Sequence, residues 1–225
     1  MRSFSHVSLR PVAFAMVASA MIVTSSARST TAANLVTYEI TADDMCCGGC
    51  AKKVAAQLYT APGVVDVKAN VAARTVTVFA KPSDKLTVER LWNAVEKGKG
   101  GPSKLITATA TYAFAKTQQL SDAEKAPSGM YVIVVAKLKA NGAAELVGRE
   151  LRGVRGVKTT VVNLDSDQLV VEPQQGVHLS TLALAAAVER AKQQPLTITG
   201  PQGRLTIEPA APQLSSRQKS LGDVR

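Results

Sequence analysis

Apolar residues between residues 34 and 114 follow two patterns, one typical of strands and one typical of helices, and these patterns take turns along the chain. Apolar and polar side chains alternate where half-buried strands are expected, and apolar residues recur every three or four positions where helices are expected. The predicted strands cover 36–40, 65–71, 75–80 and 105–114, and the predicted helices cover 51–58 and 86–97. The order strand, helix, strand, strand, helix, strand is typical of a split βαβ sandwich, which is an α+β fold.

The same pattern returns after residue 129. It predicts strands that begin at Tyr131, helices at 143–151 and 179–192, strands at 157–164 and 169–171, and a strand-like run at 196–208 with a turn at 200–203. A constant shift of 93 positions superposes the two segments without a gap, so that Tyr38 falls on Tyr131 and Leu86 falls on Leu179. The chain is therefore predicted to contain a tandem repeat.

All three cysteines lie between a predicted strand and a predicted helix, at Cys46, Cys47 and Cys50. Two thiols separated by two residues at such a turn can meet on one soft metal ion, and a helix N-terminus favours the thiolate form. The shift of 93 places Lys139, Ala140 and Ala143 at these positions in the second segment. Because the second copy keeps the apolar pattern without the thiols, the cysteines are predicted to serve function.

Charge and composition exclude some classes of protein. The 225 residues are 46% hydrophobic with a net charge of +10, which is compatible with one or two globular domains. The basic residues are scattered, without a dense run or interleaved aromatics, so nucleic-acid binding is not expected. No Ser/His/Asp set, phosphate-binding glycine loop or catalytic carboxylate pair is present, so no enzyme activity is expected.

The first 33 residues have the pattern of an export signal. Arg2, His6 and Arg10 precede an apolar run at 12–23, and small residues allow cleavage after Ala27 or Ala33. The apolar run is shorter than the roughly 20 residues that cross a bilayer as a helix. An uncleaved N-terminal anchor is the alternative. We expect a periplasmic or secreted protein that is not inserted in the membrane after cleavage.

The sequence Met45-Cys46-Cys47-Gly48-Gly49-Cys50, together with Pro62-Gly63-Val64, resembles the heavy-metal-associated domain family of copper chaperones, metal-transporting ATPases and the periplasmic mercury-binding protein. The resemblance covers about residues 35–114. It implies a ferredoxin-like fold, Cys47 and Cys50 as the two metal ligands, and Met45 packed beneath the loop. The second segment looks like a degenerate copy without ligands.

Two residues depart from the family pattern. Asp44 stands where the family usually has Gly, and Cys46 stands where it usually has Thr or another small residue. Cys46 is either a third ligand or a half-exposed bystander. Two sulfurs suit near-linear Cu(I), which is the ion expected first, whereas three sulfurs with a nearby carboxylate favour Zn(II), Cd(II) or Pb(II). Hg(II) is the remaining candidate ion.

Other polar residues near the motif have two interpretations each. Asp43 and Asp44 are either solvated loop charges or supports for the ligands, and Lys97 and Lys99 either offset thiolate charge or are plain surface lysines. His178 is interpreted as a polar residue at a helix start, and Trp92 as core. Gly48-Gly49 fits a loop whose backbone approaches a metal closely.

These observations predict two ferredoxin-like domains: a signal peptide at 1–33, a metal-binding domain at 34–114, a linker at 115–128, a second domain without cysteines at 129–209, and a flexible tail at 210–225. The predicted function is an extracytoplasmic copper or heavy-metal chaperone or scavenger that exchanges its ion with a donor or acceptor protein. Two alternatives remain: a thiol–disulfide or redox-sensing protein, and an interaction module with a vestigial site.

Overall fold

The computed structural model describes residues 35–140 and 142–210. The predicted signal peptide and all but the first residue of the predicted tail lie outside the described residues. In the ranges 35–140 and 142–210, none of the helices is both long and apolar enough to cross a bilayer.

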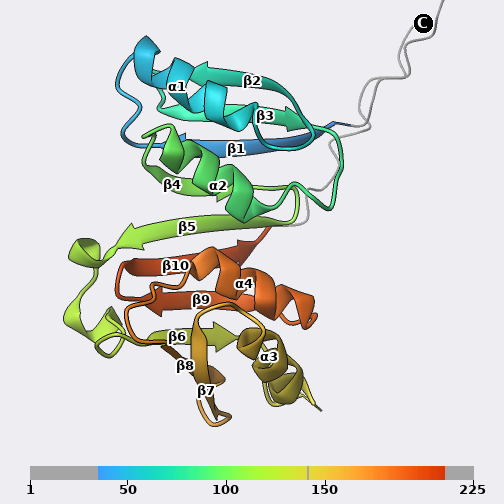
Figure 1. The fold of residues 1–225 in the computed structure, drawn as a ribbon, viewed down its shortest axis with the longest axis vertical. Coiled ribbons are helices and arrows are strands. Elements are labelled where there is room, and N and C mark those ends of the chain that lie inside the picture. Colours follow the sequence, from blue (N-terminus) through green and yellow to red (C-terminus); the bar gives the residue numbers. More distant parts are fainter. Residues whose placement is uncertain (1–34, 141, 211–225) are drawn as a thin grey trace, which may run out of the picture. The chain divides into compact units, whose positions relative to one another are not determined.

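The first segment folds as strand, helix, two strands, helix and two strands (Figure 1). Its elements are β1 (Val36–Ala42), α1 (Gly48–Leu58), β2 (Val64–Asn70), β3 (Thr75–Ala80), α2 (Val88–Lys97), β4 (Pro102–Ile106) and β5 (Ala110–Lys116). The strands are ordered β2-β3-β1-β4-β5, and each neighbouring pair is antiparallel. The first four strands form the predicted ferredoxin-like βαββαβ sheet, and β5 adds a strand beyond it.

The second segment repeats this order. After two short 3₁₀ helices, η1 (Thr117–Gln119) and η2 (Asp122–Glu124), come β6 (Tyr131–Val135), α3 (Ala143–Arg152), β7 (Val157–Asn163), β8 (Gln168–Pro173), α4 (Thr181–Arg190), β9 (Pro195–Gly200) and β10 (Gly203–Pro209). The bounds of β7, β8, α4 and β10 are those of β2, β3, α2 and β5 shifted by 93 positions. The fold is therefore α+β, with two ferredoxin-like units in tandem.

The prediction of one strand at 105–114 is wrong, because the run contains a tight turn between β4 and β5. Thr107 makes this turn without glycine or proline: its hydroxyl accepts the backbone N–H of Ala110 at 2.9 Å and that of Thr109 at 3.2 Å. The same hydroxyl donates to the carbonyl of Ala110 at 2.9 Å. A threonine side chain thus supplies the local hydrogen bonds that usually mark a turn by sequence.

Strands β5 and β10 join the two sheets into one sheet of ten strands. The pairing is antiparallel and runs from Ala110 opposite Pro209 to Lys116 opposite Gly203, with Ala113 opposite Thr206 at its middle. Nearby, the hydroxyl of Tyr112 donates to the carboxylate of Glu189 at 2.8 Å. The predicted linker, 115–128, accordingly begins with the last two residues of β5.

The core lies between the sheet and the helices. Along β3, Val76, Val78 and Ala80 are fully buried, while the residues between them are half-buried on the other face. Helices α1 and α2 contact each other, as do α3 and α4, so both helices of each unit cover the same face of the sheet (Figure 1). Trp92 belongs to this core, as predicted, and packs edge-to-face against Phe114 at a centroid distance of 6.2 Å.

Candidate metal centre

The loop between β1 and α1 is held to the first unit by backbone hydrogen bonds. The N–H groups of Asp43 and Asp44 donate to the carbonyls of Gly101 at 3.0 Å and Gly100 at 2.9 Å. The N–H of Met45 donates to the carbonyl of Ala42 at 3.0 Å, and the Met45 side chain is fully buried. The loop that carries the cysteines is therefore anchored on its β1 side by three hydrogen bonds and one core side chain.

Two glycines let α1 and α2 approach closely beneath this loop. A Cβ added to Gly98 would lie 2.7 Å from the Cα of Val54, and one added to Gly100 would lie 2.9 Å from Cγ2 of Val54. At Gly98 a larger residue would require the backbone of α1 to shift, and at Gly100 it would first displace the side chains of Val54 and Val95. The clue to this close packing in the sequence is the density of glycines between 98 and 101.

Cys47 is the N-cap of α1. Its backbone is extended, its carbonyl accepts the N–H of Ala51 at 3.0 Å, and its Sγ accepts the N–H of Cys50 at 3.4 Å. The predicted helix at 51–58 therefore begins three residues earlier, at Gly48. Since an N-cap side chain faces the unpaired N–H groups of the first turn, this position favours a thiolate.

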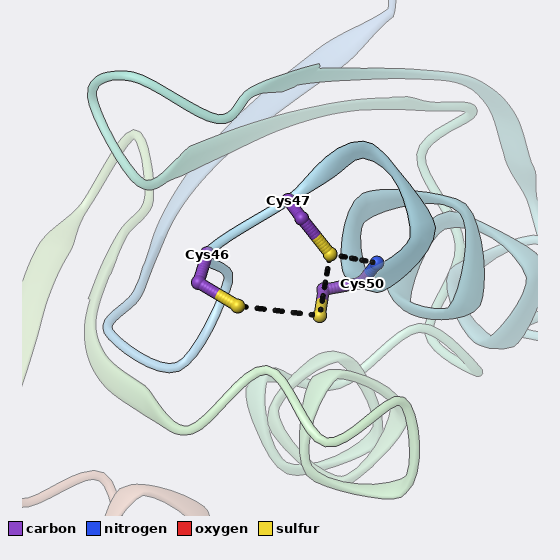
Figure 2. Close-up of side chains that lie close together, drawn as sticks. All are labelled: Cys46, Cys47 and Cys50. Atoms are coloured by element: carbon purple, nitrogen blue, oxygen red, sulfur yellow. Dashed lines mark hydrogen bonds between the residues drawn. The ribbon is translucent and has the colours of Figure 1, made fainter.

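The three thiols face one another above the start of α1 (Figure 2). The Sγ of Cys47 lies 3.2 Å from that of Cys50, and the Sγ of Cys46 lies 3.7 Å from that of Cys50. All three sulfurs lie within 4.8 Å of one another, and no carboxylate oxygen or imidazole nitrogen of the described residues joins this group. Cys46 and Cys47 are exposed, Cys50 is half-buried, and all three are free thiols.

Hydrogen bonds inside the loop separate the acidities of two thiols. The backbone N–H of Cys50 and then the Cys50 thiol lower the pKa of Cys47 to about 7. The same thiol contact with Cys47 raises the pKa of Cys50, because once Cys47 has ionised the proton of Cys50 stabilises the Cys47 thiolate. The loop thus holds one thiol that is readily ionised near neutral pH beside one that keeps its proton longer.

The other residues singled out from the sequence lie outside this group. Lys97 and Lys99 are exposed, and in the part of the chain that the structure describes neither forms an ion pair. A Cβ at Gly48 would meet no other protein atom within 4 Å, and one at Gly49 would lie 3.7 Å from the Sγ of Cys47. His178 is exposed two residues before Ser180, the N-cap of α4, and lies before the helix rather than at its start.

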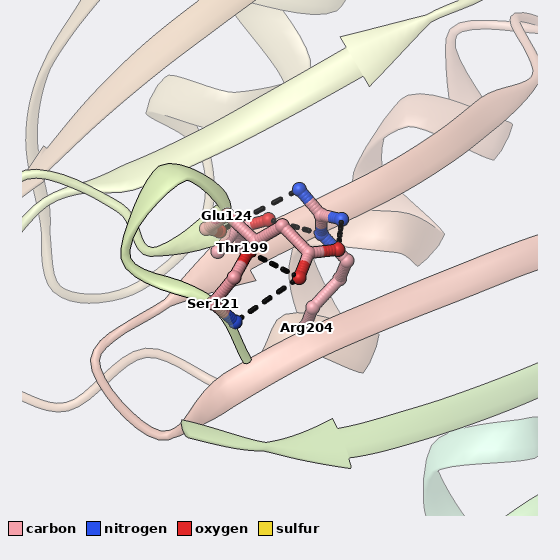
Figure 3. A network of polar contacts seen from close by, with 4 residues as sticks. All are labelled: Ser121, Glu124, Thr199 and Arg204. Atoms are coloured by element: carbon pink, nitrogen blue, oxygen red, sulfur yellow. Dashed lines mark hydrogen bonds and ion pairs between the residues drawn. The ribbon is translucent and has the colours of Figure 1, made fainter. Parts of the chain in front are cut away.

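A second polar cluster joins the segment that connects the two units to strands β9 and β10 (Figure 3). Nη1 of Arg204 donates to Glu124 at 2.8 Å, and Nε of Arg204 donates to the Thr199 hydroxyl at 3.1 Å. The backbone and hydroxyl of Ser121 also donate to Glu124, and these bonds, with Arg204, hold the pKa of that carboxyl below its usual range. Each charged group here has a partner, so the cluster fastens η2 to β10 rather than forming a second ligand site.

The profile of the heavy-metal-associated domain family matches residues 39–101. The chain contains a heavy-metal-associated domain. The match begins within β1 and ends just before β4, and it includes the three cysteines. No curated protein sequence matches the chain.

Several solved structures are similar to this heavy-metal-associated domain or to the tandem. The N-terminal soluble domains of Bacillus subtilis CopA are 18% identical, with 76% of this chain and 97% of that chain covered and a TM-score of 0.31. The Cu(I)-loaded N-terminal domain of a potential copper-translocating P-type ATPase from Bacillus subtilis is 32% identical, with 32% and 86% covered and a TM-score of 0.28. The yeast copper transporter domain Ccc2a is 12% identical, with 34% and 99% covered and a TM-score of 0.28.

Proposed function

We propose that this protein is an extracytoplasmic soft-metal binder, a chaperone or scavenger of copper, that takes its ion through Cys47 and Cys50. The observation that carries the proposal is the cluster of thiols at the start of α1 in a heavy-metal-associated domain. Thiolate sulfur selects Cu(I) and other soft ions over magnesium or calcium. The names of the similar solved structures, two of which are copper-loaded or copper-transporting domains, agree with this choice of ion.

The proposed mechanism of delivery is ligand exchange with a partner protein. Each thiol of the acceptor loses a proton as its sulfur binds the ion, and each cysteine sulfur that leaves the ion takes up a proton, while the oxidation state of the metal is unchanged. The exposure of Cys47 supports this step, because an incoming sulfur can reach the ion from solvent. The export pattern of residues 1–33 supports a location outside the cytoplasm.

We further propose that the second unit is a copy of the same domain that has lost its ligands. The equivalents of the three cysteines are Lys139, Ala140 and Ala143, while the shift of 93 preserves the surrounding elements. A unit of this kind provides an edge strand to the first and a surface for a partner without binding an ion of its own.

Titration of the reduced protein against competing chelators tests the metal site. We expect one Cu(I) per chain, lost in Cys47→Ser and in Cys50→Ser. Ala140→Ser, at the position equivalent to Cys47 in the second unit, is the matched control and should bind as the unaltered protein does. Parallel titrations with Zn(II), Cd(II), Pb(II) and Hg(II) rank the ions. Absence of tight binding by every one of these ions would contradict the proposal.

A redox function is the second candidate, favoured by the pKa of Cys47 at about 7. A thiol with a pKa near the ambient pH attacks disulfides most effectively. Under this alternative the metal-free protein reduces a small disulfide such as oxidised glutathione, and Cys47→Ser abolishes the reaction. A protein that binds Cu(I) tightly and exchanges no faster than free cysteine excludes it.

A further inference from the structure

The third thiol is the feature of the loop that two-sulfur binding does not use. The Sγ of Cys46 lies 3.7 Å from that of Cys50, only 0.5 Å farther than the Sγ of Cys47. Figure 2 shows the three sulfurs facing one another, with dashed lines joining the Cys50 sulfur to the other two. Although Cys46 is exposed, its sulfur points toward the other thiols.

All three sulfurs lie close enough to one another for a single ion to reach them, within 4.8 Å. With a metal–sulfur bond of about 2.3 Å, two sulfurs on opposite sides of an ion lie about 4.6 Å apart, whereas sulfurs at bond angles between tetrahedral and trigonal lie about 3.8–4.0 Å apart. The Cys46–Cys50 distance of 3.7 Å is close to the second value, and the Cys47–Cys50 distance of 3.2 Å is below both. Converging on three bonds requires only small side-chain movements.

The backbone holds Cys46 in this position. Its preceding neighbour, Met45, is fully buried and donates its N–H to Ala42, and its following neighbour, Cys47, is the N-cap of α1. Cys46 is thus confined between a core side chain and a helix start. A ligand fixed in this way loses little conformational entropy when it binds.

We propose that Cys46 is the third ligand of the ion, and that the resulting three-sulfur site slows transfer of the ion to a partner protein. The inference rests on the proposed function, because it concerns the same ion. A two-sulfur site leaves the ion open to the sulfur of a partner. In a three-sulfur site the tethered thiolate of Cys46 occupies that position at a high effective concentration. The preferred substrate is a thiophilic ion that accepts three thiolates, and the chain acts as a scavenger more than as a donor.

The test compares Cys46→Ser with the unaltered protein, each loaded with Cu(I) or with Cd(II) in the absence of free thiols. Asp43→Ser, in the same exposed loop, and Lys139→Ser, at the equivalent position of the second unit, are the controls. X-ray absorption gives the number of sulfur ligands, and transfer to a chelator in excess gives the rate of release. Sedimentation checks that each sample is monomeric, so that no sulfur comes from a second chain.

We expect three sulfurs in the unaltered protein and in both controls, and two in Cys46→Ser. Release of Cu(I) should be at least about tenfold faster from Cys46→Ser, and this variant should lose more affinity for Cd(II) than for Cu(I). Equal sulfur counts and equal release rates in a protein that still binds one ion would overturn the inference and leave the proposed function intact. Failure of the unaltered protein to bind either ion would overturn the proposed function itself.

Discussion

The two units of this chain share the same fold and differ in the side chains of the loop before their first helix. Asp43 N–H donates to the carbonyl of Gly101 at 3.0 Å in the first unit, and its equivalent, Ala136 N–H, donates to Gln194 at 2.9 Å in the second. Met45 is fully buried beneath the first loop, and its equivalent, Leu138, is fully buried beneath the second. One backbone hydrogen bond and one buried side chain are therefore common to both loops, whether or not the loop carries thiols, and we expect that the cysteines are not needed for the fold.

The units also differ in how closely their helices pack. Gly98 and Gly100 allow close approach of α1 and α2, whereas the equivalent residues in the second unit are Ala191 and Gln193. Helix α1 begins at Gly48, directly after its N-cap Cys47, while α3 begins at Ala143 after Gly142. At the shift of 93, α3 begins two residues later than α1. Close packing and an earlier helix start thus accompany the cysteine loop.

The largest expected effect comes from removing the buried side chain beneath each loop. Met45→Ala and Leu138→Ala each leave a cavity in the core and should lower the free energy of unfolding by about 2–5 kcal/mol. Only Met45→Ala should also weaken Cu(I) binding, by about tenfold or more, because the backbone next to Cys46 then loses the side chain that fixes it in the core. Chemical denaturation and chelator competition measure the two effects. Equal loss of affinity in both variants would show that global stability, not the anchor, controls the site.

A smaller loss is expected where the helices of the first unit touch. Gly98→Ala places a Cβ against the backbone of Val54 and should lower the free energy of unfolding by about 1–3 kcal/mol. Gly48→Ala is the matched control in α1: its Cβ meets nothing within 4 Å, and it should be neutral or stabilising by up to about 1 kcal/mol. Thermal unfolding measures both. A Gly98→Ala protein as stable as the unaltered one would show that α2 can move away without cost.

The acidities of the thiols give a pH dependence that the second unit cannot show. Because the pKa of Cys47 is lowered to about 7, its thiolate fraction rises about tenfold between pH 6 and pH 8. Its alkylation rate in the metal-free protein should rise accordingly, while Cys50, whose pKa is raised, should react at higher pH. Mass spectrometry of peptides after timed alkylation follows each residue. Simultaneous labelling of Cys47 and Cys50 across this range would contradict the hydrogen-bond arrangement.

The smallest effect is expected from removing the thiols altogether. The triple variant Cys46→Ser, Cys47→Ser, Cys50→Ser should change the free energy of unfolding of the metal-free protein by less than about 0.5 kcal/mol, as surface substitutions do. Denaturant titration without metal is the measurement. The metal-loaded protein should be more stable than this variant by the binding free energy of its ion. A triple variant that fails to fold would mean that the thiols hold the loop together after all.

Much of the fold follows from local patterns in the sequence. Glycine and proline at 200–203 marked the turn between β9 and β10, and alternation of side chains marked β1, β2 and β3. The turn at Thr107 was missed because a side-chain hydroxyl makes it, and side chains that replace glycine leave no simple signal. The pairing of β5 with β10 was also missed, since the sequence of an edge strand does not indicate which distant strand it pairs with.

The candidate site was predictable in composition but not in geometry. The spacing of Cys47 and Cys50 predicted a thiol pair at a helix start, and the resemblance predicted that Met45 lies beneath the loop, where it is buried. The direction of the Cys46 side chain depends on hydrogen bonds between residues 43–45 and the residues at 42, 100 and 101. Such tertiary contacts decide loop conformation, so the convergence of three sulfurs required the structure.

The pairing of β5 with β10 has a further consequence. Ala113 lies opposite Thr206, which is its own equivalent at a shift of 93, and Ala110 lies opposite Pro209, the equivalent of Lys116. This is the register that two identical subunits would adopt around a two-fold axis. The two units therefore pair as the subunits of a symmetric dimer would, but within one polypeptide, so their association does not weaken on dilution. A symmetric dimer would display two identical loops, whereas in the fused pair one loop carries three cysteines and its equivalent carries none.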